Sequence, residues 1–329
     1  MAAVTPVAGQ ADTTVVREGR PRRPAAVRLR AAALRRGRDR GTCATQVDVQ
    51  DGHTELVRRY YDNNTGVFDR LGRAGGSIHR AVWGPGVSTR AEAFHYVDDL
   101  VQRALPAGVA RPAVVDLGCG LGASLLYLAG RSDMTGEGIT ISPLQAERAT
   151  RRIAEVGAAD RVRCREGNYL SLPRDLAGTA DLAFSIEAFA HGPDASGYFR
   201  EAARTLRPGG RLVVCDDFRA GSATSTTPRA ARRLAQFRTG WRVGSLLTVE
   251  QVRTLAAAHG LTLVGDLDLT PHLELRRPRD RWINLLVAAG RPLRLPGDYW
   301  QSLLGGDALQ WCLVHGALQY RVLQFERAA

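Results

Sequence analysis

The stretch VVDLGCGLGASLLYLAG, residues 114–130, carries glycine at three alternate positions, Gly118, Gly120 and Gly122, between an apolar run and a segment with helical apolar spacing. This order predicts a buried strand, a glycine-rich turn and a helix. Glycine lets a ligand approach the backbone closely, and the N-terminus of a helix beginning near Ala123 favours a carboxylate or phosphate. The stretch therefore predicts a ligand-binding turn at the carboxyl end of the first strand of an α/β sheet.

Strand and helix patterns alternate beyond this turn. Strands are predicted at residues 113–118, 136–141, 162–167, 180–187 and 211–218, with helices at 122–130, 143–157 and 198–206 between them. Such alternation indicates a doubly wound α/β fold, in which a parallel sheet has helices on both faces. Two further strands are predicted at 261–270 and 319–328, separated by about 48 residues of mostly helical pattern. An insertion of that length usually covers a site.

Three regions are predicted along the chain. Residues 1–48 are rich in Arg, Ala, Pro and Gly and lack apolar periodicity, which favours a disordered tail. Residues 49–108 predict N-terminal helices that form a cap contributing to the substrate pocket; one of them begins at Thr89, with Glu92 three residues later in a capping box. Residues 109–329 contain the α/β domain, with the helical insertion at about 271–318 acting as a lid.

The net charge of +12 suggests nucleic acid as a partner, but its distribution points elsewhere. Ten arginines and three acids lie in the first 40 residues, so this segment carries +7 and the rest of the chain only +5. All basic residues are arginine, as a GC-rich coding bias would produce. A disordered tail is the favoured interpretation, and an arginine-rich nucleic-acid arm is the alternative.

The cysteine pattern predicts reduced thiols, and the lengths of the apolar runs predict a protein that stays in the cytoplasm. Five cysteines are scattered without paired ligand spacing, which argues against a disulfide framework and a zinc site. No apolar run is long enough to span a bilayer, and no signal-peptide pattern opens the chain. We therefore expect a cytoplasmic protein without a membrane partner.

The glycine spacing lacks the register of the dinucleotide fingerprint, and the second strand lacks the acidic residue that such enzymes place near its end. Thr140 stands there instead, and Thr140 and Gln145 offer hydrogen bonds to a ribose.

Five segments in this order, VVDLGCGLGAS, GITISPLQ, CREGNYLSLP, FSIEAFAH and LRPGGRLVV, resemble the motifs of class I S-adenosylmethionine-dependent methyltransferases over about residues 110–220. GITISPLQ is similar to the subset that methylates alkene carbons. Residues 60–97 and the closing LQYRVLQFER further resemble bacterial isoprenyl (geranyl) diphosphate C-methyltransferases. The resemblance implies a Rossmann-like seven-stranded sheet and S-adenosylmethionine as cofactor.

The resemblance also implies which residues bind the cofactor. Asp116 and the three glycines would hold its methionine end, Thr140 and Gln145 its ribose, and Asn168 and Tyr169 its adenine. The full set implied is Asp116, Gly118, Cys119, Gly120, Gly122, Thr140, Gln145, Asn168, Tyr169 and Ile186. Tight turns for the glycines and a helix-capping role for Asp116 are the structural alternatives.

Methylation of an alkene leaves a carbocation that must lose a proton to a base, away from water. Glu187 follows the fourth strand and is the candidate base, and His191 is predicted to orient it or to bind the substrate. The alternatives are a helix cap for Glu187 and a surface position for His191.

A diphosphate tail requires cations and polar donors, and arginine suits it best. His79, Arg80 and Trp83 lie in one glycine-rich segment and supply charge and an aromatic wall. Mg²⁺, bridging the phosphate oxygens and reached by Asn64, is implied by the resemblance. The predicted substrate-binding set is Tyr60, Tyr61, Asn63, Asn64, His79, Arg80, Trp83, Tyr299 and Trp300, with Trp311 also in the insertion. A solvated turn and ordinary core packing are the alternatives.

The sequence thus predicts a C-methyltransferase that adds a methyl group to an alkene carbon of an isoprenyl diphosphate in terpenoid biosynthesis. A methyltransferase acting on oxygen, nitrogen or carbon of another secondary metabolite is the alternative. An RNA methyltransferase is disfavoured, because SIEAF replaces the Asn-Pro-Pro-aromatic motif of amino-directed nucleic-acid enzymes. Chain length, methylated carbon, final double-bond position and homo-oligomer formation stay open.

Overall fold

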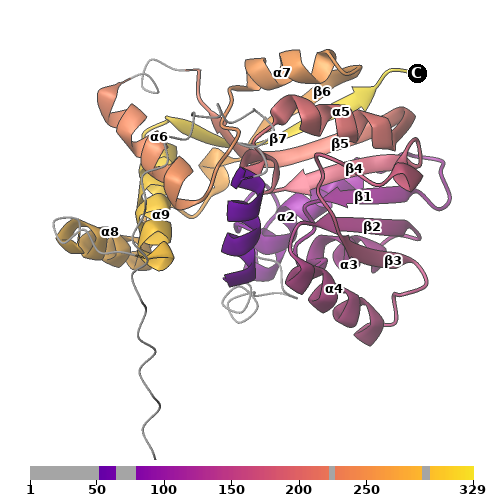
Figure 1. Ribbon diagram of the computed structural model, residues 1–329, viewed down its shortest axis with the longest axis horizontal. Coiled ribbons are helices and arrows are strands. Elements are labelled where there is room, and N and C mark those ends of the chain that lie inside the picture. Colours follow the sequence, from indigo (N-terminus) through magenta and orange to yellow (C-terminus); the bar gives the residue numbers. More distant parts are fainter. Residues whose placement is uncertain (1–51, 64–78, 222–226, 291–296) are drawn as a thin grey trace, which may run out of the picture. The chain divides into compact units, whose positions relative to one another are not determined.

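A seven-stranded sheet with the strand order β3-β2-β1-β4-β5-β7-β6 forms the centre of the protein in the computed structural model (Figure 1). The structure describes residues 52–63, 79–221, 227–290 and 297–329. The predicted tail, residues 1–48, and Asn64 lie outside these ranges. The strands are β1 (Ala113–Leu117), β2 (Thr135–Thr140), β3 (Val162–Glu166), β4 (Ala180–Ile186), β5 (Leu206–Arg219), β6 (Leu261–Asp268) and β7 (Leu318–Arg327).

Helices precede and connect the strands. A helix over residues 52–63 comes first among the described residues. It is followed by α2 (Arg90–Arg103), α3 (Ala123–Ala129), α4 (Pro143–Glu155), α5 (Ala195–Thr205), α6 (Pro228–Gly240), α7 (Val249–Ala257), α8 (Pro278–Gly290) and α9 (Asp298–Val314). Short 3₁₀ turns are η1 (Arg174–Leu176), η2 (Phe189–His191) and η4 (Thr270–His272).

The sheet is mixed rather than wholly parallel. Strands β1 to β5 pair in parallel, whereas β7 inserts between β5 and β6 and runs antiparallel to both. The alternating pattern of residues 319–328 reads the same in either direction, so sequence periodicity identified the strand without its orientation. The seven predicted strands and the Rossmann-like architecture are confirmed.

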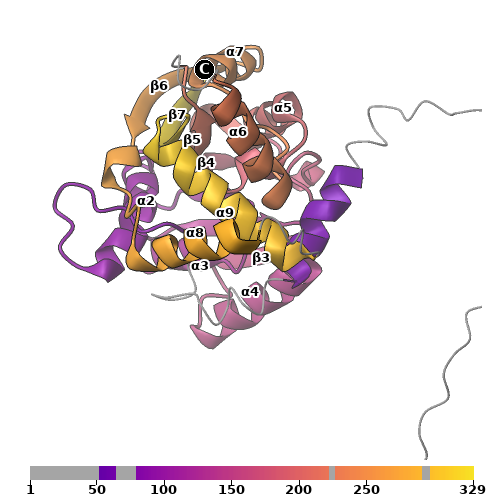
Figure 2. The same cartoon turned by 90° about the vertical axis from the view of Figure 1, so that its left-hand side faces the viewer.

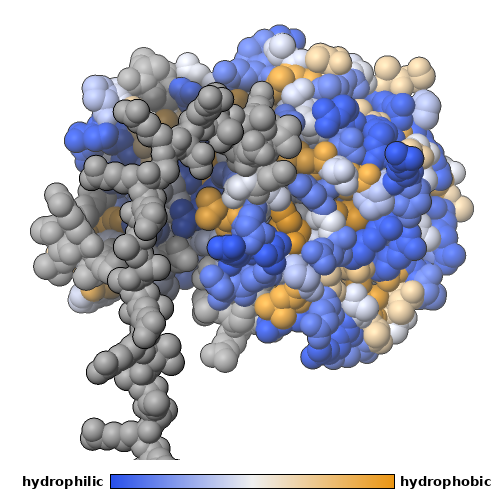
Figure 3. Space-filling view, in the orientation of Figure 1, coloured by the Kyte–Doolittle hydropathy of each residue, from blue (hydrophilic) through white to orange (hydrophobic). Residues whose placement is uncertain are grey.

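Each face of the sheet has its own core. Side chains of α2, α3, α4, α6 and α9 pack on one face, together with Phe184 of β4. Side chains of α5 and α7 pack on the other, with Phe218 of β5 and Phe325 of β7. Helices α5 and α7 lie side by side in Figure 1. The outer surface in Figure 3 is mostly hydrophilic with scattered apolar side chains, as expected for a sheet covered on both faces.

Local sequence signals start several helices. Thr89 and Glu92 form the predicted capping box of α2, and Thr248 and Gln251 form another at α7. Helix α4 begins with Pro143 after the N-cap Ser142, whose hydroxyl accepts from the backbone N–H of Gln145. Each cap satisfies a helical N–H that would otherwise lack a partner.

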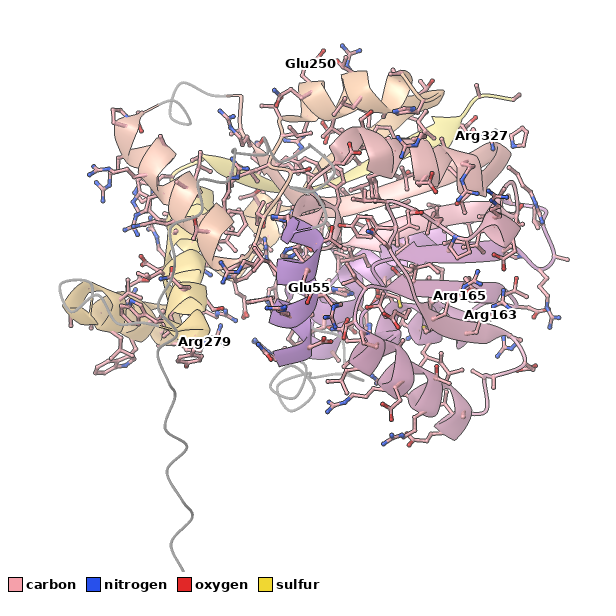
Figure 4. The ribbon with its side chains drawn as sticks, viewed as in Figure 1. Glu55, Arg163, Arg165, Glu250, Arg279 and Arg327 are labelled. Carbon is pink, nitrogen blue, oxygen red and sulfur yellow. The ribbon has the colours of Figure 1, made fainter. Side chains whose placement is uncertain are left out.

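Strand β3 forms one edge of the sheet. Its Arg163 and Arg165 both contact Glu137 of β2, and Arg165 also pairs with Asp175 at 3.1 Å (Figure 4). Charged side chains on an edge strand hinder pairing with another chain.

The insertion before β7 is helical, its helix α9 packs on the face of the sheet that also carries α6, and its role as a lid over the site stays a prediction. Helices α8 and α9 lie side by side in Figures 1 and 2, and α9 packs against α6. The ring of Trp300 fills the space next to Gly290, where a Cβ atom would lie 2.4 Å away. Trp300 of α9 therefore packs against α8 at Gly290.

Within the described residues, none of the helices is long and apolar enough to cross a bilayer. The same residues contain no cluster of three or more His, Cys, Asp and Glu side chains suited to a metal ion. Cys119, Cys164, Cys215 and Cys312 are buried free thiols, while Cys43 lies outside the described ranges.

Candidate functional site

A cavity of about 230 Å³ opens where the carboxyl ends of β1, β2, β4 and β5 meet. The helix over residues 52–63 and the end of α6 supply further walls, so segments far apart in sequence enclose it. Its lining includes Thr54, Val57, Tyr60, Tyr61, His79, Arg80, Gly118, Cys119, Gly120, Ser124, Thr140, Gln145, Asn168, Tyr169, Ile186, Glu187, His191, Asp216, Asp217, Phe237, Trp241 and Val243. Most of the predicted site residues are thus brought together.

The glycine turn has the open backbone that the sequence predicted. Gly118 has φ +104° and Gly120 φ +53°, both in the left-handed region. The N–H groups of Gly118 and Cys119 both donate to the carbonyl of Ile139, at 2.9 and 3.0 Å, which anchors the turn to β2. A Cβ atom on Gly118 would lie 2.4 Å from the Ala188 Cβ atom, so only glycine fits there.

Polar groups at the ends of β2 and β3 fit the ribose and adenine of S-adenosylmethionine. The Thr140 hydroxyl donates to Oε1 of Gln145 at 2.8 Å, which leaves the Gln145 amide nitrogen to face a ligand. Oδ1 of Asn168 accepts from the N–H of Leu170 at 2.9 Å, so its amide nitrogen is the group it offers to an adenine nitrogen. The residues present therefore suit the predicted cofactor.

Two predicted cofactor residues lie behind the cavity wall. Asp116 is 3% exposed and does not line the cavity, and burial, with the charge of Asp98, raises its pKa well above the usual range. Gly122 is the N-cap of α3, and a Cβ atom there would lie 3.2 Å from the Cys164 sulfur. Both flank the glycine turn in sequence, Asp116 in β1 and Gly122 at the start of α3.

Glu187 lies at the end of β4 with φ +52°, an uncommon conformation for a residue with a side chain. Its Oε1 accepts hydrogen bonds from the backbone N–H of Arg80 at 3.0 Å and from the hydroxyl of Tyr320 at 2.8 Å. Burial favours the protonated form, but the charge of Arg80, the neighbouring His79 and these hydrogen bonds outweigh it, so the pKa of Glu187 is lowered. Glu187 is a carboxylate at neutral pH and does not cap a following α-helix, since η2 starts after Ala188.

Arg80 lies at the cavity, but its guanidinium is already paired. Its two terminal nitrogens donate to both oxygens of Asp217, at 2.7 and 2.6 Å. Asp217 is 3% exposed, and a buried bidentate pair of this kind is costly to separate. A diphosphate would have to compete with Asp217 for Arg80.

His191 ends η2 and lines the cavity next to Tyr61, with ring centroids 5.5 Å apart. Burial lowers the pKa of His191 to about 4, so its ring is neutral at pH 7. Its backbone carbonyl contacts the His53 ring at 3.0 Å, which ties the helix over residues 52–63 to this turn. It is not the surface residue that was the alternative, and no hydrogen bond joins it to Glu187 among the described residues.

The remaining predicted substrate residues divide into two groups. Tyr60, Tyr61 and His79 line the cavity, and His79 contacts the Ser124 hydroxyl of α3 at 3.0 Å. Asn63 is exposed and outside the cavity. Asn64, the residue predicted to reach a magnesium ion, lies outside the described residues.

The tryptophans and Tyr299 predicted as walls lie elsewhere. Trp83 hydrogen-bonds through its backbone to His272 at 2.8 Å, beside η4. Tyr299 is 75% exposed, Trp300 packs on Gly290, and Trp311 stacks on His315 next to a second cavity. Trp300 and Trp311 thus take part in packing among α6, α8 and α9, which was the alternative that the sequence had left open, whereas Tyr299 lies on the surface.

Residues that follow β5 in the chain form apolar and aromatic walls of the cavity, the role predicted for Trp83, Tyr299 and Trp300. Phe237, Trp241 and Val243, at the end of α6 and just beyond, line the cavity. The Trp241 ring nitrogen donates to the carbonyl of Ser302 at 3.2 Å, which fixes this wall to α9. Sequence reasoning missed them because α6 carries an ordinary amphipathic pattern.

Asp216 and Asp217 were also missed, although a signal existed. Two acids interrupt the apolar strand VVCDDF at its carboxyl end, the same edge that identified Glu187. Burial and the adjacent Asp217 raise the pKa of Asp216 to about 7. Its oxygens accept from the N–H groups of Ala190 at 3.0 Å and Asp217 at 2.8 Å. At this cavity the ionised Glu187 thus lies beside Asp216, which is partly protonated at neutral pH.

Comparisons with known proteins agree with this site. The family model described as "Methyltransferase domain" matches residues 115–214. A probable tocopherol O-methyltransferase of Oryza sativa subsp. japonica is 33% identical over 171 residues, 50% of this chain and 46% of that protein. The 27-O-demethylrifamycin SV methyltransferase of Amycolatopsis mediterranei is 34% identical over 160 residues, 49% of this chain and 57% of that protein. The chain spans about half the length of these curated relatives.

The fold is shared with a solved structure, geranyl diphosphate C-methyltransferase from Streptomyces coelicolor A3(2) in complex with Mg²⁺, geranyl diphosphate and S-adenosyl-L-homocysteine. The TM-score is 0.61 at 20% identity, and the match covers 84% of this chain and 98% of that chain. The matched segment shows that residues 115–214 form a methyltransferase domain, and the strand order and the solved structure show the fold that this domain shares with the geranyl diphosphate C-methyltransferase.

Proposed function

We propose that the protein methylates an alkene carbon of an isoprenyl diphosphate, with Glu187 as the base. The observation that carries this proposal is the Glu187 carboxylate, ionised and set in a cavity whose walls include Tyr60, Tyr61, Phe237 and Trp241. Aromatic faces stabilise a developing cation, and an enclosed wall keeps water from it.

The proposed reaction balances with a methyl donor, an alkene acceptor and Glu187 as the proton acceptor. S-adenosylmethionine, which the glycine turn, Thr140 and Gln145 would hold, would supply an electrophilic methyl group, and the alkene π electrons would form the new carbon–carbon bond as the sulfur–carbon bond breaks. The acceptor is left as a tertiary cation. Loss of a proton from a neighbouring carbon to Glu187 then restores a double bond.

The diphosphate end of this substrate is negatively charged, and binding it requires more positive charge than Arg80 alone provides. Arg80 is shared between Asp217 and Glu187, and Asp216 adds further acidity nearby. A magnesium ion carried in with the diphosphate would offset this acidity. Dependence on Mg²⁺ is therefore part of the proposal.

Methylation of a hydroxyl group is the second candidate. It is favoured by the two curated relatives, whose names describe methyl transfer to tocopherol oxygen and to a demethylated rifamycin. Asp216 suits a hydroxyl better than Glu187 does, because its pKa of about 7 makes it the stronger base once ionised.

The test is incubation of the purified protein with S-adenosylmethionine and isopentenyl, dimethylallyl, geranyl and farnesyl diphosphates, with Mg²⁺ and with chelator. A phenolic acceptor and a macrolactone alcohol form the second arm. Mass spectrometry detects a gain of one methyl group, and NMR locates it. A carbon-methylated diphosphate that requires Mg²⁺ supports the proposal. An oxygen-methylated product, or no diphosphate product while calorimetry shows cofactor binding, rejects it.

A further inference from the structure

Every hydrogen bond that the described residues make to the Glu187 carboxylate falls on one oxygen. Oε1 accepts from the N–H of Arg80 at 3.0 Å and from the hydroxyl of Tyr320 at 2.8 Å, and Nε of Arg80 lies 3.8 Å from it. Oε2 accepts no hydrogen bond from the described residues, and Glu187 lines the cavity. The two oxygens of this carboxylate are therefore not equivalent.

The donors are themselves held firmly. Tyr320 of β7 is fully buried and lies directly opposite Asp217 of β5 in the antiparallel ladder. The Arg80 guanidinium is clamped by Asp217 and lies over the Tyr320 ring, 4.6 Å from its centroid. The pairing of β5 with β7 thus fixes the hydroxyl and the guanidinium in one arrangement.

The backbone of Glu187 is fixed as well. Its N–H donates to the carbonyl of Cys215 at 2.8 Å, although its φ of +52° is unfavourable for a residue with a Cβ atom. Such strain persists where surrounding contacts enforce it, often at functional sites. A fixed backbone and a fixed Oε1 leave the side chain little freedom to exchange its oxygens.

We propose that Tyr320 is a positioning residue that, with the N–H of Arg80, reserves Oε1 of Glu187 and leaves Oε2 as the atom that takes the proton. The role of Glu187 as base rests on the function proposed above. Donors that stabilise the carboxylate also weaken it as a base. A weak base suffices for a carbocation, whose neighbouring protons are strongly acidic, but serves an alcohol poorly. The arrangement therefore favours carbon over oxygen as the methyl acceptor.

The experiment follows the titration of Glu187 by NMR, in full-length protein labelled with ¹³C at the glutamate side-chain carboxyl. Glu187→Gln identifies the resonance. Tyr320→Phe removes one donor from Oε1, and Tyr198→Phe is the matched control, because its buried hydroxyl pairs with Ser185 at 2.7 Å, outside the cavity. We expect the midpoint of Glu187 to rise in Tyr320→Phe and to stay unchanged in Tyr198→Phe. Equal midpoints in wild type and Tyr320→Phe would overturn the inference.

Placing 3-fluorotyrosine at position 320 provides a second variant that keeps the hydroxyl and the fold. Its stronger donor should lower the midpoint, and a midpoint that does not fall counts against the inference. Neither NMR readout needs a substrate, so both stand even if no isoprenyl diphosphate is methylated and the proposed function fails.

Kinetics then test the positioning role with whichever acceptor gives turnover. In Tyr320→Phe we expect kcat to fall about 10-fold and KM for the acceptor to change by less than about 2-fold, because Tyr320 acts through the base. The acidic limb of the pH profile should move up with the NMR midpoint. An unchanged kcat, or a loss confined to KM, would contradict a positioning role.

Discussion

Glu187 lines the cavity as a carboxylate with a lowered pKa, and it is the proposed base. It keeps its charge in a half-buried position because Arg80 and Tyr320 stabilise the carboxylate, whereas burial and the adjacent Asp217 raise the pKa of Asp216 to about 7. Two carboxyl groups at one cavity thus have pKa values displaced in opposite directions by their surroundings.

Glu187→Gln keeps the shape of the side chain and removes its ability to take a proton. We expect cofactor affinity to stay within about 2-fold and turnover to fall about 100-fold or more, the usual cost of losing a general base. Calorimetry with S-adenosylhomocysteine and single-turnover methylation measure the two quantities. Wild-type turnover would remove Glu187 from the mechanism.

Gly118→Ala tests the close approach of the glycine turn. A Cβ atom would lie 2.4 Å from the Ala188 Cβ atom at a φ of +104°, so we expect a loss of about 2 to 5 kcal/mol in unfolding free energy and at least about 10-fold weaker cofactor binding. Gly178→Ala is the matched control, since its φ is +64° but no atom lies within 4 Å. It should cost about 1 kcal/mol and leave cofactor binding intact. Equal effects of the two variants would contradict a special role for Gly118.

Asp216 predicts a pH dependence of stability. Its pKa in the folded protein, about 7, exceeds the usual aspartate value of 3.8, so the folded state binds this proton more tightly than the unfolded state. The contribution to stability is complete below about pH 4 and is lost as pH rises towards 7, by a few kcal/mol at most.

Asp216→Asn should remove that pH dependence, although it also loses a hydrogen bond to a backbone N–H. Denaturant unfolding from pH 5 to 8 should therefore show the stability difference between wild type and variant shrinking as pH rises. A difference independent of pH would mean that Asp216 is ionised throughout this range.

At the scale of elements, the aromatic residues of α6 and those of the α8–α9 pair have different roles, the first at the cavity wall and the second in helix packing and on the surface. The end of α6 carries Phe237 and Trp241 into the cavity wall, while α8 and α9 use Trp300 against Gly290 and leave Tyr299 on the surface. The sequence does not separate the two cases, because a helical stripe records burial and does not record the neighbour that buries it.

Trp241→Ala and Trp300→Ala separate these roles. Trp241→Ala should raise the acceptor KM or lower kcat by about 10-fold or more, because it opens the wall beside Tyr60 and Tyr61. Trp300→Ala should cost about 1 to 3 kcal/mol in unfolding free energy while kcat/KM stays within about 2-fold. A large loss of kcat/KM in a folded Trp300→Ala protein would restore the predicted lid.

At the scale of the whole molecule, the cavity depends on the helix over residues 52–63, which lies N-terminal to the methyltransferase domain. Thr54, Val57, Tyr60 and Tyr61 all line it, and His53 contacts the carbonyl of His191. The sheet alone would leave this side of the cavity open to water.

Deletion of residues 1–45 should leave cofactor affinity and turnover within about 2-fold, since the arginine-rich segment has the composition of a disordered tail. Deletion of residues 1–63 is the contrast, because it removes the helix at the cavity. We expect it to lose methyl transfer while calorimetry still detects cofactor binding. Loss of activity in the shorter deletion would assign the tail a catalytic or nucleic-acid-binding role.

The sequence by itself determined the strands, the glycine turn and the position of Glu187. These features are local: strand and helix periods, glycine at left-handed positions and a polar residue after a buried strand are written in consecutive residues. Only the tertiary structure decided that β7 runs antiparallel, that Tyr320 and Asp217 face each other, that Arg80 is paired with Asp217, and that Trp241 rather than Trp300 walls the cavity. The contacts of Asp217 with Tyr320 and with Arg80 join residues more than 100 positions apart, and periodicity carries no information about which distant side chains meet. The chemistry of the turn was therefore readable in the sequence, and the environment that sets the charge of Glu187 was not.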